Sequence, residues 1–151
     1  PHADPDVRAA LVGLAASHTR GHVTRAVMEG VAFSLNDTFG IFEELAVPVT
    51  RIRVGGGGAR SALWREIQAA VYGHPVETVA AEEGAAYGAA ILAGVGAGFW
   101  PSVDAACDRI VHTAGVTPVD PAVSTVMRGR YAEYRRIYPA LCDIFRDATP
   151  S

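Results

Sequence analysis

The sequence is poor in charge and in long apolar runs, and each shortage excludes a class of protein. Only 19% of the 151 residues are charged and the formal net charge is -3, so no basic surface for nucleic acid is expected. The most apolar run, residues 84–100, is shorter than the roughly 20 residues that a membrane-spanning helix needs. We therefore expect neither nucleic acid nor a membrane as a partner.

The sequence is also poor in cysteine and in metal-binding motifs. The two cysteines, Cys107 and Cys142, lack the spacing of a metal site, and reduced thiols in a cytoplasmic protein are preferred over one disulfide bond. His18 and His22 are four residues apart, but no Glu-containing His motif and no third ligand accompany them. We expect a hydrogen-bonded or solvated role for both, and no metal site. The chain begins at Pro1 without a methionine or signal peptide, which suggests a piece of a longer protein.

The most informative segment is a run of four glycines, residues 55–58. It follows the β-favouring segment 51–54 and precedes a helical pattern over 62–72, with Ser61 in the N-cap position. Glycine lets the backbone approach a flat ligand closely or adopt a positive φ. Because a helix N-terminus beside an open cavity suits a nucleotide, residues 54–61 are predicted to form a nucleotide-binding turn.

The glycines alone leave alternatives open. The phosphate-loop ATPase motif is excluded because no Gly-Lys-Ser/Thr follows them. The dinucleotide fingerprint fits in part: Gly56 and Gly58 take its first two positions, Ser61 takes the third, and Glu77 is a candidate for the ribose-binding acid. A turn without a ligand and a dinucleotide-binding module are both compatible with these residues.

The remaining patterns predict a single α/β domain. We expect strands at residues 7–12, 51–54 and 75–78, and helices at 19–45, 62–72, 84–100, 102–110 and about 121–147. The crossover through the second helix predicts that strands 51–54 and 75–78 are parallel. Pro75 favours an edge position for the latter strand, Pro139 is expected to kink the last helix, and residues 113–120 are expected to form a surface loop. The helix at 84–100 is expected to be buried.

Several motifs occur together in a recognisable order. They are His-Thr-Arg at 18–20, Arg-Ala-Val at 25–27, Glu-Gly-Val at 29–31, Val-Gly-Gly-Gly-Gly-Ala-Arg-Ser-Ala-Leu-Trp at 54–64, Pro-Val at 75–76 and Glu-Glu-Gly-Ala-Ala-Tyr-Gly-Ala-Ala at 82–90. In this order and spacing, over roughly residues 1–121, the chain resembles the C-terminal lobe of the carbohydrate kinases called the FGGY family. The ordered set is more specific than the glycines alone.

This resemblance implies an actin-like, ribonuclease H-like fold of two lobes, with helices packed on a short, mainly parallel sheet. ATP and a sugar would bind between the lobes, and this chain would be an incomplete domain from the second lobe. Residues 83–97 resemble a connecting helix whose small residues let the lobes pivot during closure. The positions that match the family's adenine-binding motif are Gly56, Gly57, Gly58, Ala59 and Ser61. A side chain at Gly57 would occupy the space of the purine.

Other functional parts of the family have no match here. They are the Asp-x-Gly-x-Thr phosphate loop, the second phosphate loop and the aspartate base, so no catalytic residue is assigned and the chain alone is expected to be inactive. Upstream residues are expected to complete a Mg²⁺ site. The implied partners are an adenine nucleotide, a sugar, the missing N-terminal lobe and a second copy in a homodimer. Overall similarity favours xylulose as the sugar, with gluconate, glycerol and ribulose as alternatives. A non-catalytic interaction domain that docks through its small-residue helix is a further hypothesis.

Overall fold

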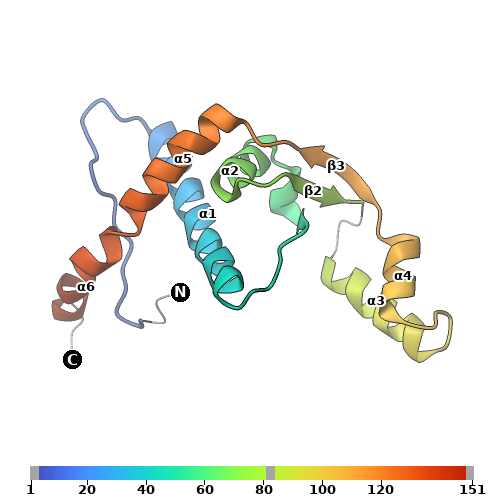
Figure 1. Cartoon of the computed structure of the whole chain (residues 1–151). Coiled ribbons are helices and arrows are strands. Elements are labelled where there is room, and N and C mark those ends of the chain that lie inside the picture. Colours follow the sequence, from blue (N-terminus) through green and yellow to red (C-terminus); the bar gives the residue numbers. More distant parts are fainter. Residues whose placement is uncertain (1–3, 81–83, 149–151) are drawn as a thin grey trace. The chain divides into compact units, whose positions relative to one another are not determined.

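The computed structural model describes residues 4–80 and 84–148 and has a mixed α/β architecture (Figure 1). The chain divides into two compact units. The first comprises residues 1–49, 70–72 and 120–151, and the second comprises residues 50–69 and 73–119. The pair Glu82 and Glu83, which belongs to the motif at 82–90, lies outside the described residues.

The first unit is helical, and its longest helix, α1, spans Arg20–Glu44. This confirms the predicted helix at 19–45. Thr19 is the N-cap, and its backbone N–H donates to His22 Nδ1 at 3.1 Å. Helix α1 packs against α5 (Pro121–Tyr134), which begins after the N-cap Asp120. The carboxylate of Asp120 accepts two backbone N–H groups, and the following Pro121 tolerates the first helical position because it needs no partner for an N–H.

An aromatic cluster joins α1 to α5. The ring of Phe33, which is only 5% exposed, lies 5.8 Å from that of Tyr131 and 5.4 Å from that of Tyr134, measured between centroids. The Tyr131 hydroxyl donates to Asp37 on α1, and burial with this carboxylate raises the pKa of Tyr131. These two tyrosines of α5 therefore serve packing against α1.

The last helical segment is two helices instead of one kinked helix. Helix α5 ends at Tyr134 and α6 spans Ile137–Asp147, so the break falls at residues 135–136. Pro139 lies in the first turn of α6, where its missing N–H costs nothing. In a continuous helix, however, its ring would meet the carbonyl four residues earlier, at Arg135. The helix therefore stops one turn before the proline, and the predicted kink at Pro139 itself is wrong.

The predicted strand at residues 7–12 is also absent. This segment has no regular structure, and within the described residues the sheet contains only three strands from the second unit. Apolar side chains favour a strand only when a neighbouring strand is available for the backbone hydrogen bonds. Here Leu11 and Val12 instead line a groove beside the start of α1.

The second unit contains a three-stranded sheet in the order β1-β2-β3. Strand β1 (Ile52–Val54) pairs in parallel with β2 (Val76–Val79), which confirms the predicted parallel pair, and β2 pairs antiparallel with β3 (Thr113–Thr117). Figure 1 shows β2 and β3 side by side. Strand β2 therefore has a neighbour on each side, and the predicted edge position is wrong. Pro75 does not prevent this, because it precedes Val76, the first paired residue. Residues 113–117 form a strand where a loop was expected.

Helices alternate with the strands of this sheet in the sequence. Helix α2 (Ala62–Tyr72) matches its predicted bounds, and α4 (Val103–Ile110) begins after its N-cap Ser102 as expected. Helix α3 (Gly84–Gly96) packs against α4, and the Tyr87 hydroxyl donates to the Ile110 carbonyl at 2.7 Å. Cys107 and Cys142 carry free thiols.

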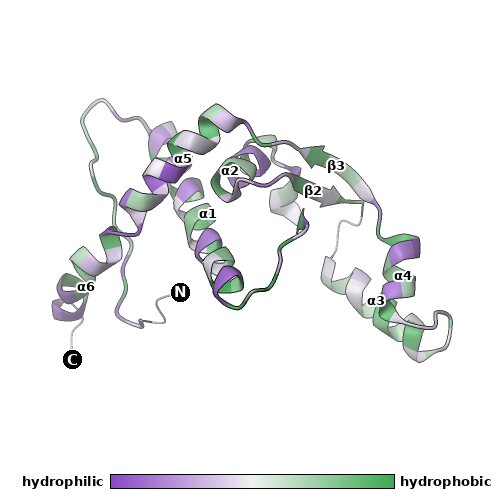
Figure 2. Cartoon of the chain, in the orientation of Figure 1, coloured by the Kyte–Doolittle hydropathy of each residue, from purple (hydrophilic) through white to green (hydrophobic). Residues whose placement is uncertain are grey.

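Helix α3 is apolar but mostly exposed, contrary to the expectation of a buried helix. Figure 2 colours it in white to green along its length. Ile91 is 6% exposed, whereas Leu92 is 62% exposed and Phe99, just beyond the helix, is 79% exposed. An apolar helix is covered only where a neighbour reaches it, and within its own unit α3 has α4 on one side. No helix in the described ranges combines the length and hydropathy needed to cross a membrane.

We predict that Gly94→Ala destabilises the chain. An added Cβ would lie 2.2 Å from Trp100 Cζ3 and 2.6 Å from its Cε3, so the indole must move. Such overpacking costs about 1–3 kcal/mol. Gly88→Ala in the same helix is the matched control, because its Cβ would meet no atom within 4 Å and the helix gains from alanine. In urea unfolding, Gly94→Ala should have a lower free energy of unfolding than the wild type. The free energy of unfolding of Gly88→Ala should equal or exceed that of the wild type.

Candidate nucleotide-binding site

The predicted site is the connection between β1 and α2 in the second unit. After Val54 the chain passes through Gly55 and Gly56 into a short 3₁₀ helix, Gly57–Arg60. The turn is closed by two backbone hydrogen bonds: Ala59 N–H donates to the Gly56 carbonyl and Ser61 N–H donates to the Gly58 carbonyl, both at 3.1 Å. The glycines of this turn are exposed. The structure thus places all five predicted binding residues, 56–59 and 61, in one compact turn.

The glycines of the turn differ in their backbone conformation and in their neighbours. Gly56 has φ +73°, a conformation that is costly for other residues. A Cβ on Gly58 would lie 3.4 Å from two atoms of the Trp64 indole, so a side chain there would be in van der Waals contact with the ring. Gly57 has neither constraint: its φ is not positive, and an added Cβ would meet nothing within 4 Å. The fold itself therefore does not explain the glycine at position 57.

Ser61 has a defined structural task at the end of the turn. Its Oγ accepts the backbone N–H of Trp64 at 3.3 Å and so caps α2, as predicted. The helix ends at Gly73, whose φ of +66° confirms the predicted C-cap. Because the Ser61 hydroxyl accepts in the cap, its proton is available for donation. Ser61 is exposed and can offer that proton to a ligand at the turn.

Arg65 is a residue of this site that sequence reasoning did not assign. Its Nη1 donates to the Ala59 carbonyl in the turn, and its Nε donates to Thr117 Oγ1 on β3 at 3.2 Å. The only sequence signal was its place in the motif after Trp64. Its reach to a strand 52 residues away depends on the tertiary fold.

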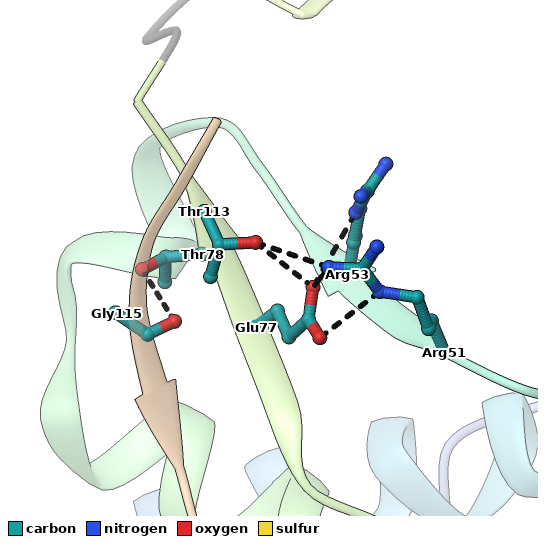
Figure 3. Close-up of polar contacts among 6 residues, drawn as sticks. All are labelled: Arg51, Arg53, Glu77, Thr78, Thr113 and Gly115. Carbon is teal, nitrogen blue, oxygen red and sulfur yellow. Dashed lines mark hydrogen bonds and ion pairs between the residues drawn. The ribbon is translucent and has the colours of Figure 1, made fainter. Parts of the chain in front are cut away.

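Glu77, the candidate ribose-binding acid of the dinucleotide alternative, lies on β2 within a network of polar side chains (Figure 3). Arg51 contacts both of its carboxylate oxygens, at 3.1 and 2.7 Å, and Arg53 Nε lies 3.4 Å from Oε2. Thr113 Oγ1 on β3 donates to Oε2 at 3.1 Å. The hydrogen bonds from Arg51, with smaller contributions from Thr113 and Arg53, lower the pKa of Glu77. This carboxylate therefore ties three strands together and is already engaged by cations.

The two histidines make local backbone contacts in the first unit. His18 Nδ1 accepts the Ala15 N–H at 2.9 Å, and His22 Nδ1 accepts the Thr19 N–H. The hydrogen-bonded role predicted for them is confirmed. Across the described ranges, no three metal-ligating side chains come together.

Comparison with known proteins identifies the family of the chain. Residues 1–97 match the family model of the FGGY family of carbohydrate kinases, C-terminal domain. The chain belongs to the FGGY family of carbohydrate kinases. Its fold is therefore part of the actin-like fold of these enzymes, as the sequence motifs predicted.

Individual FGGY relatives agree with this assignment. A xylulose kinase of Bacillus subtilis (strain 168) is 36% identical over 114 residues, which cover 76% of this chain and 23% of the relative. A gluconokinase of the same strain is 34% identical over 144 residues, which cover 95% of this chain and 26% of the relative. The chain thus spans about a quarter of the length of these curated relatives.

A solved FGGY structure shows the same fold. The crystal structure of xylulose kinase from Rhodospirillum rubrum matches 95% of this chain with a TM-score of 0.82 and 32% sequence identity. The match covers 29% of that chain. The resemblance read from the ordered motifs is thereby confirmed at the level of both family and fold.

We predict that Glu77→Gln makes the free energy of unfolding less dependent on pH in the acidic range. Because the folded-state pKa of Glu77 lies below its ordinary value of 4.5, its contribution is complete above about that pH and is lost as the pH falls through the lower folded value. Thermal unfolding at several pH values should show the wild type above Glu77→Gln near neutral pH and a shrinking gap in acid. Glu133→Gln is the control, because that carboxylate is 70% exposed and lies 3.8 Å from its arginine. An equal, pH-independent gap for Glu77→Gln would contradict the prediction.

Proposed function

We propose that this chain supplies the adenine-binding part of an ATP-dependent sugar kinase. Membership of the FGGY family supports a carbohydrate kinase, and the open space at Gly57 is the observation that carries the nucleotide assignment. A flat purine needs close approach to the backbone, and Gly57 leaves room that nothing in its own unit fills. Gly56, Gly58 and Ala59 build the backbone of this surface, and Ser61 donates to the adenine.

The remaining chemistry of the kinase is assigned to parts outside this sequence. Transfer of the γ-phosphate to a sugar hydroxyl needs a base and a metal ion that neutralises charge on the phosphates. Neither has candidates in the turn, so Mg²⁺ is proposed to bind at residues of the upstream lobe with the nucleotide phosphates. We propose that the chain alone does not phosphorylate sugar. The lobe pivot assigned to residues 83–97 and a cytoplasmic location remain predictions.

The proposed sugar is D-xylulose, with xylulose 5-phosphate as the product. Relatives named xylulose kinase with 36% and 32% identity support this choice. A gluconokinase at 34% identity and a glycerol kinase at 41% identity over 101 residues keep gluconate and glycerol as alternatives. Sugar specificity is best tested in the full-length kinase by comparing kcat/KM for the three substrates.

The competing hypotheses have less support. A dinucleotide module needs Glu77 for the ribose, but this carboxylate is held by Arg51, Arg53 and Thr113. An interaction domain docking through α3 predicts self-association that Gly88→Leu abolishes without any nucleotide effect. A homodimer is compatible with the kinase hypothesis too, so association alone does not separate the two.

We predict that Gly57→Val raises the KM for ATP of the full-length kinase at least tenfold and leaves the KM for the sugar unchanged. The added side chain would occupy the purine space, whereas the fold has room for it. Gly56→Ala provides the contrast in stability, because at φ +73° and ψ -175°, a region occupied almost only by glycine, it should cost about 1–3 kcal/mol whatever the ligand. Steady-state kinetics and thermal unfolding measure both effects. A wild-type KM for ATP in Gly57→Val would exclude the site.

We further predict that Ser61→Ala and Ser102→Ala lose similar stability but differ in nucleotide binding. Each serine caps a helix, with Oγ accepting an N–H at 3.3 Å for α2 and 3.1 Å for α4. Loss of such a cap costs about 1 kcal/mol. Only Ser61→Ala should also weaken ATP binding by roughly two- to tenfold, the usual worth of one hydrogen bond. Equal KM values for ATP in the two variants would contradict the prediction and would mean that Ser61 only caps α2.

A further inference from the structure

Arg65 connects the glycine turn to the far strand of the sheet. It lies in the first turn of α2 and is half-buried. Its Nη1 donates to the Ala59 carbonyl and its Nε donates to Thr117 Oγ1 at 3.2 Å. All three residues belong to the second unit. One side chain thus bridges the turn, the helix and β3.

The chemistry of arginine makes this bridge directional. The guanidinium is planar and carries five N–H donors in a fixed fork, so two bonds from one group fix the relative orientation of their acceptors. The Ala59 carbonyl belongs to the 3₁₀ turn that begins at Gly57. Holding this carbonyl limits how the peptides of the turn can rotate. Trp64, one residue before, lies against Gly58, so neighbouring side chains of α2 hold two points of the turn.

We propose that Arg65 is a positioning residue for the nucleotide, which keeps the turn in the conformation that receives adenine. It acts through the Ala59 carbonyl, and Thr117 orients its guanidinium. The inference rests on the proposed function of the turn and adds two residues that the motif comparison does not assign: Arg65 and Thr117. Loss of either contact lets the turn adopt other conformations. The fraction of molecules that can bind the nucleotide then falls, and the apparent affinity for ATP falls with it.

The test uses the full-length kinase that contains this chain, with KM measured for ATP and for the sugar, together with kcat. Arg65→Ala should raise the KM for ATP by roughly three- to tenfold, within the range that the loss of hydrogen bonds gives, and leave the KM for the sugar unchanged. Arg65→Lys keeps the charge but loses the planar fork, so it should restore the KM for ATP only in part.

Thr117→Val tests the route through β3 with a nearly isosteric change. It should raise the KM for ATP by about two- to threefold, and the double variant with Arg65→Ala should be no worse than Arg65→Ala alone. Thr78→Val is the matched control: Thr78 Oγ1 donates to the Gly115 carbonyl of β3 at 3.3 Å, whereas the side chain of Arg65 donates to a carbonyl of the turn. Thr78→Val should leave both KM values unchanged.

Three results would overturn the inference. The first is a wild-type KM for ATP in Arg65→Ala while Gly57→Val raises it. The second is a fall in kcat with both KM values unchanged, as expected when a variant only reduces the folded fraction. The third is additivity of Arg65→Ala and Thr117→Val. If Gly57→Val itself leaves the KM for ATP unchanged, the proposed function fails, so the two failures are distinguishable.

Discussion

Pairing of β2 on both of its sides is the constraint on which the second unit depends. Its backbone bonds to β1 in parallel and to β3 in antiparallel register. Val76 is fully buried on one face of β2. On the other face Glu77 contacts Arg53 of β1, Arg51 just before β1 and Thr113 of β3. Because β1 is fixed in this way, the point where it ends is fixed too. The glycine turn therefore obtains its position from the sheet.

The parts of the fold that could be predicted from the sequence are those specified by nearby residues. Ser61 and Gly73 mark the two ends of α2 through an N-cap and a left-handed C-cap, and both act within one helical turn. The same holds for Ser102 before α4. The five turn residues are assigned by composition and motif order, which are local properties as well, and their role in binding stays a prediction. The bounds of α2 and α4 could therefore be predicted without knowledge of any tertiary contact.

The secondary-structure predictions were wrong where contacts with residues distant in the sequence determine the local conformation. Residues 113–117 include Gly115 and precede Pro118, so their own composition favours a loop, yet they pair with residues of β2 that lie 34 to 41 positions earlier in the chain. Residues 7–12 have the composition of a strand but no neighbouring strand. The contact of Arg65 with Thr117 has the same origin, because β2, α3 and α4 lie between the two residues along the chain. A pattern within a short sequence window does not show which distant segment will pair with it.

The distribution of aromatic residues gives the two compact units different optical properties. Both tryptophans, Trp64 and Trp100, belong to the second unit, where one lies against Gly58 and the other against Gly94. Four of the five tyrosines belong to the first unit, namely Tyr72, Tyr131, Tyr134 and Tyr138. Indole emission therefore monitors the unit that contains the glycine turn, and phenol absorbance mainly monitors the helical unit. Native spectroscopy can follow each unit without an added label.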